Sequence, residues 1–354
     1  MKAILAGGGT GGHVIPALAI ANELRARYQC EVAFVGTARG IETRLVPAAG
    51  YELKLIEVSG YKGMSIAKRL KALWAVPSSV LASLSIIRQF KPDVIIGVGG
   101  YASAPAMIAS GIAGVPSLVF EPNVVPGLAN RIAARFAKIA AVHFEQTGRW
   151  FRRFEVTGVP VREAFFHVAA KTDSTPTLLL FGGSQGARIL NRTMCEALPL
   201  VRERVPGIHI IHQTGQREYE QVRTAYEASG LTAEVSPFID DMPAAFARAD
   251  AVLCRSGAST VAEIAAAGKA AIFVPFAAAT DQHQLRNAEL LAQKNAAELI
   301  SEDMLTPECL VDAIASLLND ASRRHAIEQA ARALAHPNAA ARIADMAVEI
   351  SRTR

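Results

Sequence analysis

The sequence contains one short pattern twice: an apolar run, a glycine-rich turn and the start of a helix. Residues 3–6 lead into Gly7-Gly8-Gly9-Thr10-Gly11-Gly12-His13, and residues 177–181 lead into Gly182-Gly183-Ser184-Gln185-Gly186-Ala187-Arg188. About half of the 354 residues separate the two turns. Such turns join a parallel strand to a helix and let a phosphate group approach backbone N–H groups. We therefore expect two domains of similar plan that face each other across a cleft, with the chemistry in that cleft.

Between the two turns, and after the second, apolar runs alternate with alanine-rich helical stretches. This alternation predicts an α/β fold with two doubly wound, Rossmann-like domains, and the chain length also suits two domains. A composition of 51% hydrophobic residues allows each domain to bury a core. Residues 158–162 are the expected hinge. The expected strands are residues 2–6, 31–35, 53–58, 93–98, 117–121 and 140–144, then 177–181, 208–212, 251–254, 270–275 and 297–300.

The net charge of +5 fits an anionic substrate or an anionic membrane surface, and does not by itself indicate nucleic-acid binding. The four cysteines are far apart in the sequence, which is typical of reduced thiols in the cytoplasm. The N-terminus lacks the length and cleavage site of a signal peptide. The longest uncharged stretch, residues 72–87, is too short to span a bilayer. We expect a soluble or peripheral protein.

The first glycine turn also fits the G-x-G-x-x-G pattern of dinucleotide-binding domains through Gly7, Gly9 and Gly12. Those domains need an acidic residue at the end of the second strand to bind the ribose. Residues 35–39 contain no acid, which argues against a nicotinamide cofactor. No glycine run continues into G-K-[S/T], so a Walker A loop is excluded. A turn without a ligand remains the alternative, although five glycines in six positions cost backbone entropy.

His13 stands where the first predicted helix begins, at the carboxyl edge of the first strand. A helix N-terminus favours the neutral imidazole, which can remove a proton from an acceptor hydroxyl as a general base. The structural alternative is a histidine that hydrogen-bonds a backbone group of the turn.

In the second half, residues 255–263 follow an apolar strand and open a helix. Small residues and hydroxyls at a helix N-terminus suit a pyrophosphate, and Glu263 can accept both hydroxyls of a ribose. Thr260 and Glu263 also fit a capping box, which would be a purely structural role. Residues 280–284 then supply amide and carboxylate groups that suit sugar hydroxyls, or that form ordinary surface.

The sequence shows no pattern for a bound metal. His209 and His212 lie on a predicted strand, where their side chains point to opposite faces, so a zinc site is not expected. There is no D-x-D, the motif with which many nucleotide-sugar enzymes hold a divalent metal. A helix dipole and hydroxyls would then have to stabilise a departing diphosphate.

One segment of the first half suits a membrane surface. Four apolar residues there recur at helical spacing with basic residues beside them, which favours a helix lying in the interface of an anionic bilayer. Packing of the apolar stripe on the first sheet is the alternative. The stripe consists of Ile66, Leu70, Leu73 and Trp74, and the basic residues are Lys62, Lys68, Arg69 and Lys71.

Taken together, these motifs resemble the MurG family of N-acetylglucosaminyltransferases over essentially the whole chain. The resemblance is carried by residues 8–13, 99–105, 182–188, 238–242, 255–263 and 281–288. It implies a GT-B fold with an acceptor-binding, membrane-facing domain at residues 1–160 and a UDP-GlcNAc-binding domain at residues 161–337. It further implies that the helix within residues 338–354 packs back on the first domain.

The resemblance implies transfer of GlcNAc with inversion from UDP-GlcNAc to the C4 hydroxyl of MurNAc in undecaprenyl-pyrophosphoryl-MurNAc-pentapeptide (lipid I). This step belongs to peptidoglycan synthesis at the cytoplasmic face of the cell membrane. No metal or other cofactor and no nucleic acid is expected, and cell-wall synthesis proteins are candidate partners. The main alternative is a GT-B enzyme that acts on another lipid acceptor such as diacylglycerol. A nicotinamide-dependent oxidoreductase and a nucleotide-sugar-binding regulator are the others.

By resemblance, His13 and Glu121 are the candidate catalytic residues. Ile239 would offer backbone groups to uracil, Glu263 would bind the ribose, and Ser184 and Thr260 would face the diphosphate. Phe120 and Pro122 stand where the family usually has His and Gln, so the resemblance implies no contact for those two side chains, whereas Glu121 and Asn123 are retained. The residues expected to contact UDP-GlcNAc are Thr10, Gly11, Gly12, Asn123, Arg162, Ser184, Ile239, Ala258, Ser259, Thr260, Val261, Ala262, Glu263 and Gln284.

Overall fold

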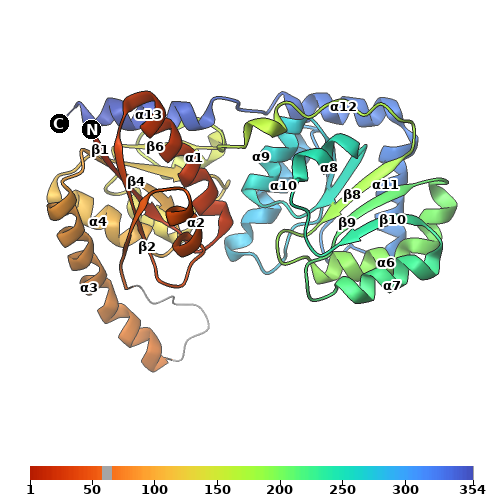
Figure 1. Ribbon diagram of the computed structural model, residues 1–354, viewed down its shortest axis with the longest axis horizontal. Helices are drawn as coiled ribbons and strands as arrows, with labels where there is room; N and C mark the ends of the chain where they lie inside the picture. The colour runs from red at the N-terminus through yellow and green to blue at the C-terminus, as the bar shows by residue number, and fades with distance from the viewer. Residues whose placement is uncertain (58–65, 354) are drawn as a thin grey trace. The chain divides into compact units, whose positions relative to one another are not determined.

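The structure is a computed structural model that describes residues 1–57 and 66–353, without the side chains of residues 66–76 and of residue 280. The chain forms two compact units (Figure 1). Unit 1 comprises Met1–Val161 and Asn338–Arg354, and unit 2 comprises Arg162–Pro337. Each unit is built on one parallel sheet with helices on both of its faces.

The sheet of unit 1 has the strand order β3-β2-β1-β4-β5-β6-β7, and all of its neighbouring strands are parallel. Its central strands are mostly apolar, as is typical of strands covered by helices on both faces. The strands are β1 (Lys2–Gly7), β2 (Glu31–Gly36), β3 (Glu52–Leu55), β4 (Val94–Gly99), β5 (Ser117–Glu121), β6 (Ile139–Val142) and β7 (Phe154–Val156). The helices are α1 (Gly11–Tyr28), α2 (Glu42–Ala48), α3 (Ile66–Phe90), α4 (Ser103–Ala113), α5 (Leu128–Ala133), the 3₁₀ helix η1 (Glu145–Trp150) and α13 (Ala339–Ser351).

The C-terminal helix α13 returns to unit 1 and packs beside α1 (Figure 1). Ile343, Met346 and Ala347 are buried on one face of α13, at the helical spacing seen in the sequence. Polar contacts hold its edges: the Tyr28 hydroxyl donates to the Asp345 carboxylate at 2.5 Å. The other face of the sheet is covered by α3 and α4, whose apolar side chains join the core of the unit.

The sheet of unit 2 has the order β10-β9-β8-β11-β12-β13, again with parallel neighbours. Its strands are β8 (Thr177–Phe181), β9 (His209–Gln213), β10 (Thr232–Ser236), β11 (Ala251–Cys254), β12 (Ala270–Phe273) and β13 (Glu298–Leu299). Its helices are η2 (Glu163–Phe165), α6 (Arg188–Arg204), α7 (Tyr219–Ser229), α8 (Met242–Arg248), α9 (Ala258–Ala267), η3 (Thr280–Gln282), α10 (His283–Gln293), α11 (Pro307–Asn319) and α12 (Ala321–Arg332).

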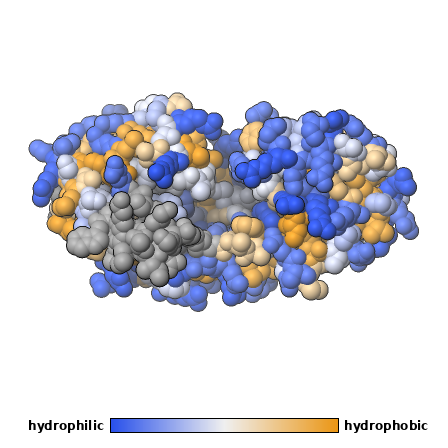
Figure 2. All heavy atoms as spheres, turned by 90° about the horizontal axis from the view of Figure 1, so that it is seen from below, coloured by the Kyte–Doolittle hydropathy of each residue, from blue (hydrophilic) through white to orange (hydrophobic). Residues whose placement is uncertain are grey.

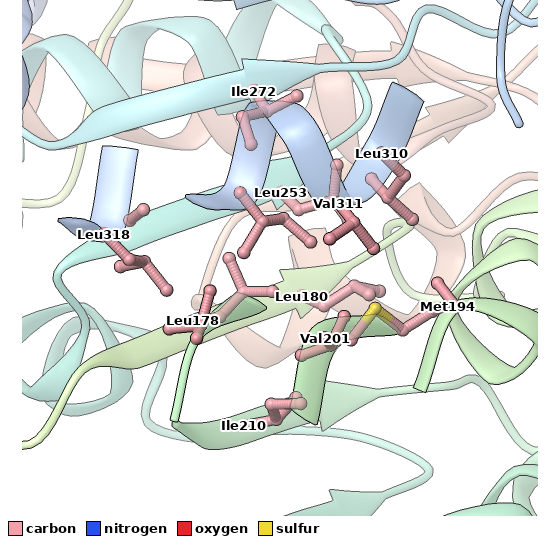
Figure 3. Packing of buried hydrophobic residues seen from close by; sticks show 14 of the residues in the cluster. Leu178, Leu180, Met194, Val201, Ile210, Leu253, Ile272, Leu310, Val311 and Leu318 are labelled. Carbon is pink, nitrogen blue, oxygen red and sulfur yellow. The ribbon is translucent and has the colours of Figure 1, made fainter. Parts of the chain in front are cut away.

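The core of unit 2 lies between its sheet and the helices α6 and α11 (Figure 3). Leu178 and Leu180 of β8 belong to one apolar cluster with side chains of both helices, among them Met194 and Leu310. The opposite sides of α6 and α7 remain in solvent, with Arg192 and Gln221 exposed, and the face in Figure 2 shows hydrophilic residues interspersed with hydrophobic ones over unit 2. Amphipathic helices thus fix the sheet and leave the carboxyl ends of its strands accessible.

The sequence did not predict the strands β7 and β10, and it placed the third strand at 53–58 instead of Glu52–Leu55. Both missed strands contain partly exposed polar residues and lie at a sheet edge, so they lack the long apolar run that marks a central strand. The predicted membrane stripe, from Lys62 to Trp74, lies outside the described residues and side chains. No helix of the described part of the chain is long and apolar enough to cross a membrane.

Candidate functional site

The strand order reverses direction once in each sheet, between β1 and β4 in unit 1 and between β8 and β11 in unit 2. Open parallel sheets bind ligands outside the carboxyl ends of their strands at this reversal, because the two neighbouring loops turn away to opposite faces. The first glycine turn follows β1 and the second follows β8. The topology therefore places each glycine turn at the position where a ligand is expected.

A cavity of about 630 Å³ opens at this position in unit 2, between the second glycine turn and the start of α9. Its volume suits a ligand of nucleotide-sugar size. The residues that line it are Phe181, Gly182, Gly183, Gly186, Ala187, Arg188, Ile189, Arg192, Arg255, Gly257, Thr260, Phe276, Gln284 and Glu302.

The charges around this cavity favour an anion. Arg188, Arg192 and Arg255 line it, and its one acidic residue, Glu302, forms an ion pair with Arg255 at 2.6 Å. The guanidinium of Arg255 also donates to the Val274 carbonyl at 2.9 Å, which fixes its direction. Helix α9 begins here with Gly257 as its N-cap and without a side-chain cap. A helix N-terminus, a glycine turn and arginines together suit a diphosphate.

Helix α9 begins at Ala258, so the capping box suggested for Thr260 and Glu263 does not form. Thr260 lies in the first turn of the helix and lines the cavity, and Glu263 follows one turn later on the same side. Burial raises the pKa of Glu263 to about 7, and the positive charge of Arg162 opposes this shift. A carboxyl group perturbed in this way beside a cavity is typical of a functional site.

The loop before α10 closes another side of the cavity. The Gln284 side-chain oxygen accepts the Phe276 N–H at 3.0 Å, and the Ser256 hydroxyl donates to the Gln284 carbonyl at 2.8 Å. Asp281 and Gln282 have φ angles of 52° and 51°, a left-handed conformation that costs energy for residues other than glycine. Strained backbone of this kind clusters at ligand-binding sites, which agrees with a role for Gln284 in binding.

Sequence reasoning missed Gln213, which lies at the end of β9 and is buried. Its side chain donates to the Gly183 carbonyl at 3.0 Å and accepts the Ile239 N–H at 2.9 Å. It thereby connects the second glycine turn to Ile239, the residue expected to bind uracil. Ser184, expected at the diphosphate, is exposed in the same turn, next to Gly183.

In unit 1, α1 begins at Gly11, earlier than the sequence suggested, so His13 lies in its first turn. The imidazole lies against the backbone of Gly99: a Cβ added at Gly99 would be 2.8 Å from Cε1 and 3.0 Å from Nδ1 of His13. Gly99 has a φ of 90°, which side-chain-bearing residues rarely adopt. The carboxyl end of β4 therefore supports the candidate base. Thr10 is the N-cap of α1, and both Thr10 and Gly12 are exposed.

Glu121, the second catalytic candidate, is buried at the end of β5 and accepts four hydrogen bonds. Asn123 donates to one of its oxygens through its backbone N–H at 2.9 Å and its side chain at 3.1 Å. Gly127 N–H and the Asn130 side chain donate to the other at 3.2 and 2.9 Å. Burial raises the pKa of Glu121, and these hydrogen bonds act against that shift. The carboxylate thus holds the loop that carries Asn123.

The predicted site residues divide between the two units. Thr10, Gly11, Gly12, His13, Glu121 and Asn123 belong to unit 1, and the others belong to unit 2. Of the predicted set, Thr260 and Gln284 line the cavity. Arg255 and Gln213 were not predicted, although each lies directly at the carboxyl end of a strand, where this fold collects ligand contacts. Within the described residues, no cluster of three His, Cys, Asp or Glu side chains could hold a metal.

Comparison with known proteins agrees with this architecture. Residues 3–142 match the glycosyltransferase family 28 N-terminal domain, and residues 177–346 match the glycosyltransferase family 28 C-terminal domain. The chain is 44% identical to the UDP-N-acetylglucosamine--N-acetylmuramyl-(pentapeptide) pyrophosphoryl-undecaprenol N-acetylglucosamine transferase of Anaeromyxobacter dehalogenans, over 100% of this chain and 94% of that protein. The protein of the same name from Syntrophus aciditrophicus is 43% identical, over 99% of both chains.

Comparison with solved structures also indicates this family. The crystal structure of Acinetobacter baumannii MurG matches with a TM-score of 0.83 and 34% identity, over 98% of this chain and 99% of that one. The likeness extends through both units and the C-terminal helix. The chain therefore belongs to the MurG family of glycosyltransferases, and its two Rossmann-like domains are those of the GT-B fold.

Proposed function

We propose that this protein transfers N-acetylglucosamine from UDP-GlcNAc to the C4 hydroxyl of MurNAc in undecaprenyl-pyrophosphoryl-MurNAc-pentapeptide, and releases UDP. The observation that carries the proposal is the positively charged cavity between the second glycine turn and α9. It lies in a chain that matches transferases of that name over its whole length. An acceptor such as diacylglycerol is not favoured by these relatives.

Unit 2 supplies most of the proposed donor contacts. The diphosphate binds the glycine turn with Ser184 and the first turn of α9, where the helix dipole and Arg255 stabilise its charge. Glu263 accepts the ribose hydroxyls when it is ionised, and Ile239 offers its carbonyl to uracil. Gln284 contacts the sugar. The remaining proposed contacts are Thr10, Gly11, Gly12, Asn123, Arg162, Ser259, Val261 and Ala262, together with Ala258 and Thr260.

His13 acts as the general base. Its neutral imidazole removes the proton from the C4 hydroxyl, and the freed oxygen attacks C1 of GlcNAc on the face opposite the diphosphate. The C1–O bond to the diphosphate breaks as the β-1,4 bond forms, and the electron pair leaves with UDP. The hydrogen bonds of Glu121 to Asn123 favour a role for this carboxylate in orienting Asn123. No metal is required in this proposal.

A lipid-linked acceptor places the enzyme at a membrane surface. We propose a peripheral association with the cytoplasmic face of the cell membrane through the apolar and basic segment that ends at Trp74. The acceptor's undecaprenyl chain can then stay in the bilayer while its sugar reaches the protein. Other cell-wall synthesis proteins are candidate partners at the same surface.

UDP release tests the proposal directly. The purified protein should release UDP from UDP-GlcNAc in the presence of lipid I, and the product should carry a β-1,4-linked GlcNAc on MurNAc. Diacylglycerol in matched vesicles serves as the second acceptor, and vesicles without acceptor measure hydrolysis alone. Release of UDP with diacylglycerol but not with lipid I would show that the acceptor is diacylglycerol and would refute the proposed acceptor. Release without any acceptor would contradict transfer.

A further inference from the structure

A buried carboxylate lies beside the first glycine turn. Glu42, the first residue of α2, is 1% exposed. One of its oxygens accepts the Gly9 N–H at 2.7 Å. The other accepts the backbone N–H and the hydroxyl of Thr37, each at 3.0 Å. Three donors from two loops thus converge on this one side chain, as they converge on a bound anion in other proteins.

Three glycines of the surrounding chain leave the space that this carboxylate occupies. A Cβ added at Gly8 would lie within 2.6 Å of both oxygens, and one at Gly36 would lie 2.7 Å from Cγ of Glu42. A Cβ at Gly40 would also overlap the carboxyl group. Burial raises the pKa of Glu42, but the hydrogen bonds from Gly9 and Thr37 outweigh it and hold the pKa below its usual value. Glu42 is therefore ionised at neutral pH.

Glu42 and His13 are linked through two interlocked turns. The Gly8 N–H donates to the Gly99 carbonyl at 3.3 Å, and a Cβ at Gly100 would overlap the Gly8 carbonyl. Gly99 in turn lies directly against the His13 ring. The path from the carboxylate to the imidazole therefore consists of hydrogen-bonded, closely packed backbone, which transmits a displacement of one turn to the other.

We propose that Glu42 is a positioning residue for His13: its carboxylate occupies the anion-binding position of the first glycine turn and fixes the turn that carries α1. In dinucleotide-binding domains an acid near this point binds a ribose. Here both carboxylate oxygens accept hydrogen bonds from the protein itself, so Glu42 stabilises the turn and does not bind a ribose. The catalytic consequence rests on the proposed function, in which His13 is the base.

The first test does not depend on turnover. The carbon–proton signals of the histidine rings are recorded by NMR for the wild type, Glu42→Gln and the control Glu52→Gln, an exposed carboxylate of β3. His13→Asn assigns the signal of interest. We expect the His13 signal to shift in Glu42→Gln and to stay in place in Glu52→Gln. An unmoved His13 signal in a folded Glu42→Gln protein overturns the proposal.

Kinetics provide the second test. Glu42→Gln should lower kcat about tenfold and leave the KM for UDP-GlcNAc nearly unchanged, because the turn orients the base and the donor binds chiefly in unit 2. Formate should restore part of kcat in Glu42→Gly by refilling the carboxylate position. If Glu42→Gln does not fold, Thr37→Val removes one of the three hydrogen bonds and should shift the same NMR signal. A wild type that releases no UDP refutes the proposed function, but the NMR result still decides the role of Glu42.

Discussion

Gln213 and Ile239 are joined by a hydrogen bond of 2.9 Å, in which the side-chain oxygen of Gln213 accepts the Ile239 N–H. The same amide donates to the Gly183 carbonyl at 3.0 Å. One buried side chain therefore sets the spacing between the glycine turn proposed for the diphosphate and the residue proposed for uracil. We therefore expect Gln213 to hold the proposed diphosphate and uracil contacts at the separation that a nucleotide requires.

Replacement of Gln213 should weaken donor binding. Gln213→Leu keeps the approximate volume but removes the partner of the Gly183 carbonyl and of the partly buried Ile239 N–H, a loss of about 0.5–1.5 kcal/mol for each hydrogen bond. We expect the KM for UDP-GlcNAc to rise about tenfold, with a smaller change in kcat. Steady-state kinetics over a range of UDP-GlcNAc concentrations measures both. Gln221→Leu, at an exposed position of α7, is the control. An unchanged KM in a folded Gln213→Leu protein would refute the coupling.

Glu263 should make donor binding depend on pH. Its pKa of about 7 means that it loses its charge, and with it one acceptor for the ribose hydroxyls, as the pH falls below 7. The KM for UDP-GlcNAc should therefore rise as the pH falls from 8 to 6, and Glu263→Gln should show a raised KM with a flatter profile. If the KM of the variant depended on pH in the same way as that of the wild type, Glu263 would not be the residue that binds the ribose.

Glu263 should also destabilise the free protein at high pH. Its pKa is raised on folding from 4.5 to about 7, so ionisation opposes folding once the pH exceeds 4.5, and the full cost is reached above 7. Glu263→Gln should raise the free energy of unfolding by about 3 kcal/mol at pH 8 and by almost nothing at pH 4. Calorimetry at both pH values measures this, with the exposed Glu203→Gln as control. A stabilisation that is equal at both pH values would contradict the raised pKa.

His13 should affect catalysis more than binding. His13→Asn removes the proposed base and should lower kcat by about 10²-fold or more, while the dissociation constant for UDP-GlcNAc changes little. Single-turnover kinetics and calorimetric titration with UDP-GlcNAc in the absence of acceptor separate the two effects. A near-normal kcat in His13→Asn would show that His13 is not the base and that Glu121 or another group has this role.

Catalysis should survive removal of metals. The proposed stabilisation of the leaving diphosphate uses the N-terminus of α9, hydroxyls and Arg255. Activity should therefore persist after exhaustive treatment with EDTA. Complete loss of activity that only a stoichiometric divalent ion restores would overturn this account.

The segment around Trp74 should bind anionic membranes. Leu73→Glu combined with Trp74→Glu places two charges on the apolar stripe, so co-sedimentation with anionic vesicles should be lost. Turnover of a short, water-soluble acceptor should persist in the same variant. Full vesicle binding by the double variant, or its failure to fold, would mean that the stripe packs inside the protein.

The sequence alone was sufficient to predict the two parallel-sheet units and the position of the glycine turns at the carboxyl ends of β1 and β8. Both predictions depend on local patterns: central strands are continuous apolar runs, and glycine turns follow them directly. The resemblance of the motifs also predicted the family, which the comparisons confirm. The roles of the individual site residues stay predictions.

Tertiary structure alone decided which distant residues support those turns. Glu42 contacts Gly9 from a helix beyond β2, and Gln213 reaches Gly183 and Ile239 from the end of another strand. Neither contact leaves a periodic signal in the sequence, because each depends on how loops from separate strands meet at one edge of a sheet. The start of α9 at Ala258 was likewise hidden, since Thr260 and Glu263 have the spacing of a capping box. Local chemistry specifies the elements, and the packing of the sheet determines which side chains meet.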